Sequence, residues 1–189
     1  MTMGIDLLTQ SNDQKSLDFL ATFLQFPRVR DALIAEAEKT PYFHLYGSEA
    51  MGRPLYMGRW WLHQYHEAGD MGARLHHIAR PDADRQLHDH PYSFTSVVLR
   101  GGYVEALPKS QEGVWGADGR EEVTLVERRT DLNPVVFRQA KDRHQIVSVL
   151  PDTLTLFITG PKSEEHSWGF YTQHGFISWR EYLGESDEA

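Results

Sequence analysis

The chain has 189 residues, 40% of them hydrophobic and 12% aromatic, which predicts one ordered globular domain rather than a disordered chain. A formal net charge of −8 disfavours partners such as nucleic acid and anionic membranes, and no apolar run is long enough to cross a bilayer. The absence of cysteine excludes a disulfide framework and a thiolate metal ligand. The first residues lack a secretion signal, so we expect a cytoplasmic protein.

An N-terminal helical segment is predicted over residues 1–40. Between residues 16 and 39, apolar residues recur at helical spacing, first before Pro27 and again after it. Proline disrupts a helix interior, so we expect two helices that meet near Pro27. They are expected to pack on the outer face of a sheet or on a partner subunit. The apolar positions are Leu17, Leu20, Phe23, Leu24, Val29, Leu33 and Ile34.

The pattern changes after residue 40. Short aromatic and β-branched runs follow, separated by Gly, Pro, Asp and Asn, and this is typical of an all-β sandwich or barrel. A β-domain is therefore predicted over residues 41–183, with a long loop near 108–120 and an acidic tail at 184–189. Strands are expected near 42–46, 59–66, 74–80, 92–100, 103–107, 122–128, 135–138, 143–150, 153–159, 168–172 and 175–179.

Two histidines two residues apart, His88 and His90, carry the clearest chemical signal. On an extended segment such residues point to one side, while Asp89 between them points to the other. A third histidine, His144, follows in a later β-like segment. Together the three imidazoles could hold zinc, iron, nickel, copper or manganese. The other interpretation is that they are ordinary polar residues, since the chain has ten histidines.

The order of these residues resembles the motifs of the cupins. Their first motif reads Gly, five residues, His-x-His, three or four residues, Glu, six residues and Gly, and it is matched here by His88, His90 and Gly101. Of the second motif, only His144 matches. The resemblance covers residues 74–176. It implies a cupin-type double-stranded β-helix, or jelly-roll barrel, and a homodimer.

The chain departs from the cupins at the glutamate of the first motif, where Phe94 or Thr95 stands. The remaining set of three histidines resembles the thiol dioxygenases of the cysteine dioxygenase type. This resemblance implies Fe(II) held by three neutral ligands, with open positions for O2 and a chelating substrate. It also implies an arginine that grips a substrate carboxylate, for which Arg59 is the first candidate and Arg74 and Arg80 are rivals.

Several of the other polar residues have two interpretations each. Arg59 adjoins two tryptophans and is either a substrate clamp or a stacked, ion-paired arginine. Glu105 either replaces the missing carboxylate ligand or forms a structural ion pair. His76 and His77 are adjacent, so only one of them can face the barrel interior.

The first functional hypothesis is an oxidoreductase, a mononuclear non-haem Fe(II) dioxygenase that acts with O2 on a small anionic substrate. Three neutral ligands leave the metal a net 2+ charge, which favours an anion. The second hypothesis is a cupin that binds a metal or small ligand without turnover. The third is a metal-assisted isomerase or lyase, with Glu105, Tyr103 or His77 as proton carrier. Fe(II) is the preferred ion, and Zn, Ni, Mn and Cu are also acceptable.

Overall fold

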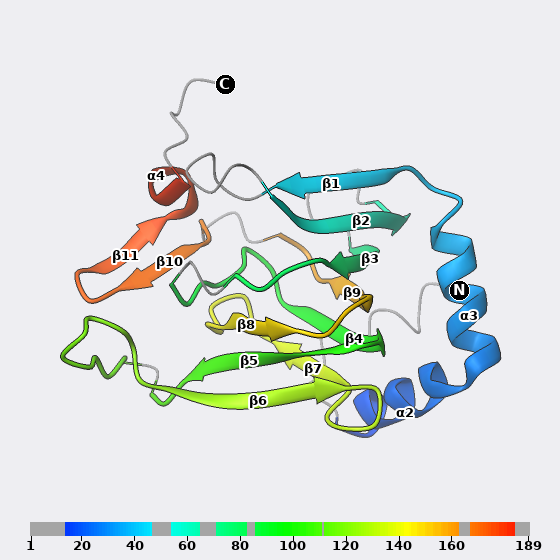
Figure 1. Ribbon diagram of the computed structural model, residues 1–189, viewed down its shortest axis with the longest axis horizontal. Coiled ribbons are helices and arrows are strands. Elements are labelled where there is room, and N and C mark those ends of the chain that lie inside the picture. Colours follow the sequence, from blue (N-terminus) through cyan, green and yellow to red (C-terminus); the bar gives the residue numbers. More distant parts are fainter. Residues whose placement is uncertain are drawn as a thin grey trace.

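The computed structural model describes residues 14–46, 54–64, 71–82, 86–110, 112–162 and 167–183 (Figure 1). The expected acidic tail at 184–189 and residues 1–13 of the N-terminal segment lie outside the described residues. Within them, two helices come first, a series of strands follows, and a short helix, α4 (Trp179–Leu183), comes last. None of the described helices has the length and apolar character needed to span a membrane.

Helices α2 (Gln14–Gln25) and α3 (Pro27–Ala37) meet at Pro27, which confirms the predicted pair. Pro27 stands at the start of α3, where its fixed φ suits a helix and its missing N–H has no helical partner to lose. The preceding residue, Phe26, is extended, with φ −64° and ψ 118°. A residue before proline favours this conformation, so the chain turns sharply between the helices.

The strands form three antiparallel sheets. One has six strands in the order β1-β2-β3-β9-β4-β7, one has three in the order β6-β5-β8, and β10 pairs with β11. Because β9 lies between β3 and β4, the chain returns late to the middle of the first sheet. The bounds are β1 (Tyr42–Tyr46), β2 (Leu55–His63), β3 (Gly72–Ile78), β4 (Phe94–Arg100), β5 (Gly102–Pro108), β6 (Val123–Arg129), β7 (Val135–Arg138), β8 (Gln145–Val149), β9 (Thr153–Thr159), β10 (Gly169–Thr172) and β11 (Gly175–Ser178).

Each of the predicted strands is present, with ends shifted by a few residues. The largest shift at a strand start is in β2, which begins at residue 55 rather than at 59. The register explains this, because Leu55 pairs with Tyr46 at the end of β1 and extends the ladder. A local pattern does not reveal such pairing, since the partner strand decides where the ladder stops.

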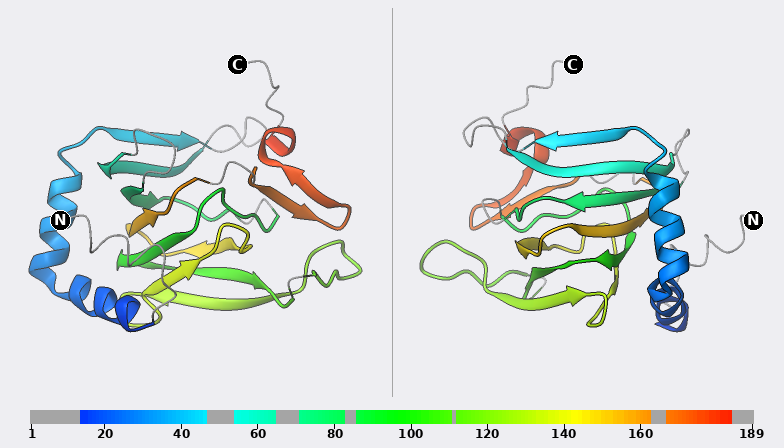
Figure 2. Two further views of the ribbon diagram at one scale, coloured as in Figure 1. Left: turned by 180° about the vertical axis from the view of Figure 1, so that it is seen from behind. Right: turned by 45° about the vertical axis from the view of Figure 1, so that its right-hand side comes forward.

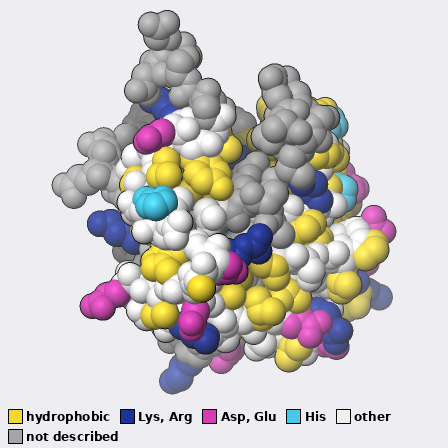
Figure 3. Space-filling view, turned by 60° about the vertical axis from the view of Figure 1, so that its left-hand side comes forward, with side chains coloured by type: hydrophobic (Ala, Val, Ile, Leu, Met, Phe, Trp, Pro, Cys, Tyr) yellow, Lys and Arg dark blue, Asp and Glu magenta, His cyan; other side chains and the backbone are white. Residues whose placement is uncertain are grey.

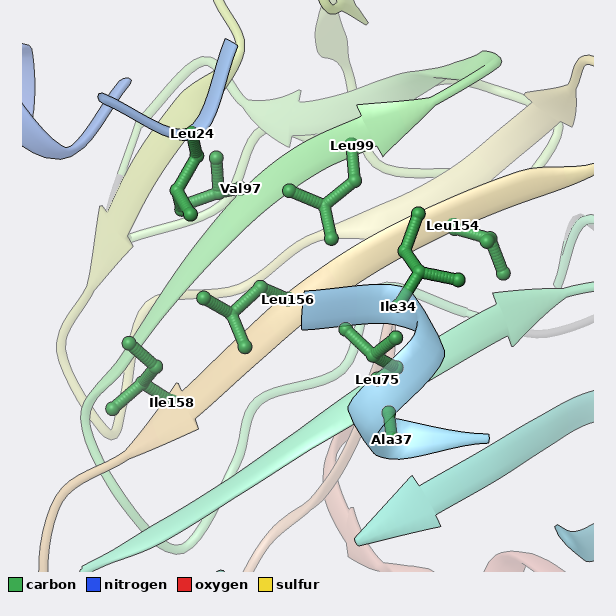
Figure 4. Packing of buried hydrophobic residues seen from close by; sticks show 9 residues of the cluster. All are labelled: Leu24, Ile34, Ala37, Leu75, Val97, Leu99, Leu154, Leu156 and Ile158. Atoms are coloured by element: carbon green, nitrogen blue, oxygen red, sulfur yellow. The ribbon is translucent and has the colours of Figure 1, made fainter. Parts of the chain in front are cut away.

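The outer face of the six-stranded sheet is apolar, and both helices cover it (Figure 4). Helices α2 and α3 contribute Leu24, Ile34 and Ala37 to this core, and the sheet contributes Leu75, Val97, Leu99, Leu154, Leu156 and Ile158. Of the two sites expected for the helices, the structure therefore has them on the outer face of a sheet. They lie on the side of the molecule away from the β10–β11 hairpin (Figures 1 and 2).

The inner face of the same sheet is polar and aromatic. Arg74 and His76 of β3 point inward and are buried, while Leu75 between them belongs to the outer core. A small apolar cluster joins this face to the three-stranded sheet: Met57, Ile78, Val98, Tyr103 and Ile146. On the surface shown in Figure 3, by contrast, acidic, basic and hydrophobic side chains are interspersed. Some charged side chains, Arg74 and Glu105 among them, are nevertheless buried inside the barrel, where burial of a charge is expensive.

Candidate metal centre

Two segments far apart in the sequence bring the three histidines together. His88 and His144 form an isolated antiparallel bridge, in which each backbone N–H donates to the other carbonyl at 3.0 and 2.9 Å. The N–H of His90 donates to the carbonyl of Ala140 at 3.1 Å. The backbone therefore fixes all three residues before any metal binds.

The three imidazole rings face one another. Their ring centroids lie 5.0 to 5.4 Å apart, and the Nε2 atoms of His90 and His144 are 3.0 Å apart. One nitrogen from each of the three rings lies within 4.8 Å of the others, and among the described residues this is the single group with such geometry. Bonds of about 2.0–2.1 Å from imidazole nitrogens to one zinc-sized ion require this kind of approach.

The protonation state of His90 suits coordination. Burial lowers its pKa well below the usual value, and His144, His88, Arg74 and Arg59 add to the effect by charge repulsion. His90 is therefore a neutral imidazole at physiological pH, which is the form that binds a metal.

A buried carboxylate lies behind each of two histidines. Asp82 Oδ2 lies 3.6 Å from Nδ1 of His88, and Glu105 Oε2 lies 3.5 Å from Nδ1 of His144. Asp82, which stands where the cupin motif has its first glycine, is held by the N–H of Ile146, which donates to its Oδ1 at 2.5 Å. Neither contact is a hydrogen bond in the structure, but a carboxylate charge beside Nδ1 favours the tautomer that leaves Nε2 free for a metal.

The negative charge of Glu105 is compensated by two arginines. It is 1% exposed, and its Oε1 accepts hydrogen bonds from Arg128 and Arg138 at 2.6 and 2.8 Å. Burial alone would raise its pKa, but His144 and the two arginines outweigh that effect and bring the pKa to about 2. Glu105 is therefore an ionised group that reaches the centre through His144.

Asp89 faces away from the other two side chains, as alternation predicts, and binds the next layer of the structure. Its carboxylate accepts hydrogen bonds from the N–H of Gly169 at 2.9 Å and from the hydroxyl of Tyr171 at 2.7 Å. These bonds attach the cap, our name for β10, β11 and α4, to the histidine segment. Trp168, just before β10, lies parallel to the His90 ring at a centroid distance of 6.4 Å.

An aromatic wall with one buried cation lies beside His90. Phe157 stacks on Phe94 at 4.6 Å and on His76 at 4.5 Å, and Tyr92 stacks on His90 at 5.8 Å. Arg74 lies within this wall, with its Nε donating to His76 at 2.9 Å and its Nη2 donating to the Tyr92 hydroxyl at 2.7 Å. Aromatic rings around the histidines exclude water from this side of the centre.

The candidate catalytic residues fall into two groups. The first group faces the interior. Arg59 of β2 lies opposite His76 of β3, and Tyr103 and Glu105 of β5 also point inward. Burial raises the pKa of Tyr103, and the charge of Glu105 adds to it. His77 is not brought to the histidine group, because it lies on the outer face, where its Nδ1 is 2.9 Å from the Tyr42 hydroxyl.

Sequence reasoning did not identify the carboxylate of Asp82 or the arginine pair that holds Glu105. One signal was present for the pair: a glutamate pointing inward from a buried strand requires a compensating charge, and inward arginines on neighbouring strands supply it. Asp82 has no such signal, because it lies outside the strands and its partner Ile146 comes 64 residues later.

Comparison with protein-family models and with curated proteins finds no match for the chain. Among solved structures it is similar to a chain from the crystal structures of the DMSP lyases RdDddP and RnDddQII, with 17% identity, 82% of this chain and 76% of that chain covered, and a TM-score of 0.51. A second similar structure is the DMSP lyase DddQ from Ruegeria pomeroyi DSS-3, with 13% identity, 79% of this chain and 75% of that chain covered, and a TM-score of 0.47. A third is an RmlC-like cupin from Shewanella frigidimarina NCIMB 400, with 16% identity, 68% of this chain and 89% of that chain covered, and a TM-score of 0.39. The chain thus has an all-β fold of antiparallel sheets that it shares with the first of these structures, preceded by a pair of helices.

Proposed function

We propose that the chain binds one divalent metal ion through His88, His90 and His144 and uses it in an enzymatic reaction on a small anionic molecule. The observation that carries the proposal is the convergence of three imidazoles, two of them backed by the buried carboxylates of Asp82 and Glu105. Imidazole rings oriented from behind in this way are typical of metal sites. Exposed histidines on a strand would need no such support.

The first candidate reaction is an Fe(II)-dependent dioxygenation. Bound iron would supply open coordination positions for O2 and for an anionic substrate, because all three protein ligands are neutral. In this chain Asp82 and Glu105 would orient His88 and His144. The rings of Phe94, Phe157 and Trp168 would exclude water from the reacting groups.

A lyase reaction on a small anion is the second candidate, and Tyr92 is the residue that favours it. Its hydroxyl contacts the Arg74 guanidinium at 2.7 Å, and its ring stacks on His90. A phenol in this position is suited to exchange a proton with a bound substrate. It would take the role of proton carrier, since Glu105 is already ion-paired and His77 lies on the outer face.

The test begins with elemental analysis of protein purified without added metal. Fe(II)-loaded protein is then assayed for O2 uptake and for O2-independent turnover with a panel of small carboxylates. Iron with carboxylate-dependent O2 uptake supports the dioxygenase, whereas turnover without O2 supports the lyase.

Single substitutions test the ligand assignment itself. We expect His88→Ala, His90→Ala and His144→Ala to lose the metal, and His77→Ala on the outer face to keep it. Full metal occupancy in all three ligand variants would refute the proposal.

A further inference from the structure

Arg74 is a buried cation whose hydrogen-bond partners are uncharged. Its side chain is part of a residue that is 2% exposed, and both hydrogen bonds it makes within the described residues go to uncharged groups, His76 and Tyr92. Its guanidinium carbon also lies near the rings of Trp61 at 4.9 Å, Phe157 at 5.0 Å and Tyr92 at 5.8 Å. No ion pair joins Arg74 to a carboxylate among the described residues.

Three other arginines, one buried and two partly buried, provide a contrast. Arg143 pairs with Glu121 at 3.0 Å, and Arg128 and Arg138 share Glu105. A guanidinium taken out of water is normally compensated in this way, by a carboxylate that the same fold supplies. Ring faces and neutral acceptors stabilise a cation less than a carboxylate does. Arg74 thus lacks the counter-charge that these arginines have.

His76 does not supply that charge. Burial lowers its pKa well below the usual value, and Arg74, Arg59 and His90 lower it further, so the ring is neutral and accepts the Arg74 N–H. Of the five N–H donors of a guanidinium, the bonds to His76 and Tyr92 use two. The others remain for an incoming acceptor with two oxygens.

Arg74 also lies close enough to the histidine group to share a ligand with it. The guanidinium and the His90 ring both contact the same two rings, since Tyr92 stacks on His90 at 5.8 Å and Phe157 lies 6.1 Å from it. The guanidinium and the His90 ring therefore border the same two aromatic rings.

We infer that Arg74 is the anion-recognition residue of the site and that the substrate is a small carboxylate, with its carboxylate on the Arg74 guanidinium and its other end toward the three histidines. The role given to the three histidines rests on the proposed function. The contact between the carboxylate and Arg74 does not. It also moves the expected carboxylate clamp from Arg59 to Arg74.

Carboxylate binding to metal-free protein tests the inference without the metal. Propionate is titrated at pH 8 while tryptophan fluorescence is recorded, because Trp61 lies against the guanidinium. Propionamide, which has the same shape without charge, is the matched ligand control. We expect saturable binding of propionate and at least tenfold weaker binding of propionamide. Equal responses to the two ligands would overturn the inference, and this comparison needs no variant.

Substitution then identifies the arginine. Arg74→Gln should weaken propionate binding about ten- to a hundred-fold, the value of one charged hydrogen-bonded contact, while Arg74→Lys should keep part of it. Arg180→Gln, which removes an exposed arginine stacked on Trp179 at 5.4 Å, should change nothing. Loss of binding in Arg59→Gln with full binding in Arg74→Gln would assign the anion to Arg59 instead.

The thermal midpoint of ligand-free protein gives a second readout. Removal of an uncompensated buried cation should leave the midpoint of Arg74→Met unchanged or higher, whereas a purely structural arginine would lower it. A protein that binds propionate but takes up no divalent metal when metal is supplied would disprove the proposed function and leave this inference standing. A protein that binds the metal but not propionate would overturn this inference and leave the proposed function standing.

Discussion

The two faces of the six-stranded sheet differ in chemistry although they belong to the same strands. On the outer face, Leu75 and its apolar neighbours form a dry core with α2 and α3. On the inner face, Arg74 and His76, one residue to either side, are buried with polar groups. Burial of a leucine stabilises the fold, whereas burial of a guanidinium or an imidazole opposes folding. The outer face therefore supplies stability and the inner face supplies binding chemistry, and substitutions on the two should have different effects.

The largest expected effect on stability is on the outer face. Leu75 is 0% exposed, so Leu75→Ala should lower the free energy of unfolding by about 2–5 kcal/mol through lost burial and a cavity. Urea denaturation measures this change. Leu125→Ala on β6, where the side chain is 61% exposed, should change it by less than about 0.5 kcal/mol. Equal losses in the two variants would contradict the assignment of the core.

The next effect concerns pH and the inner face. The folded-state pKa of Glu105 is about 2, below its ordinary value of 4.5, so its charge stabilises the fold above pH 4.5 and this contribution is lost as the pH falls toward 2. The full contribution is at most about 3 kcal/mol. Urea unfolding of metal-free protein at a series of pH values measures it. The slope between pH 4.5 and 2 should be smaller in Glu105→Gln, and identical slopes would mean that Glu105 titrates normally.

A smaller effect separates metal affinity from stability. Asp82→Asn removes the charge behind His88 and should weaken metal binding about ten- to a hundred-fold. Competition with a chelator of known affinity measures the change. Asp131→Asn, on a carboxylate that pairs with Arg129 at the surface, is the control and should bind metal as the wild type does. If the two variants bind equally, Asp82 does not support the ligand.

The smallest effect returns to the outer side of the sheet. Tyr42→Phe removes the hydrogen bond to His77 and should lower the free energy of unfolding by about 0.5–1.5 kcal/mol. Metal content by elemental analysis should not change. A drop in metal content would show that His77 communicates with the centre and that the two faces are not independent.

The features that the sequence predicted correctly depend on local patterns. The strand positions follow from alternating apolar residues and from turn residues between them, and the two helices from helical spacing interrupted by Pro27. The grouping of His88 and His90 follows from alternation alone. His144 was found because its order in the chain resembles that of the cupins. The homodimer implied by that resemblance stays a prediction.

The features that it missed depend on which strands become neighbours. The choice between His76 and His77 is made by the pairing of β3 with β2, which turns His76 inward opposite Arg59. The arginines that hold Glu105 arrive from β6 and β7, so their role requires knowledge of strand order. Likewise, the sequence does not show that Arg74 contacts His76 and Tyr92, because those contacts depend on the fold.

The hydrogen bonds of Asp89 have a consequence for how the molecule can move. A single side chain, placed between two metal-ligand candidates, holds the amide of Gly169 and the hydroxyl of Tyr171. Any displacement of β10 must therefore pull on the segment that carries His88 and His90. By thermodynamic linkage, an ion that tightens the histidine pair must also hold the hairpin closed, and a ligand that lifts the hairpin must loosen the ion to the same degree. Amide hydrogen exchange at Gly169 would then report occupancy of the centre from outside it.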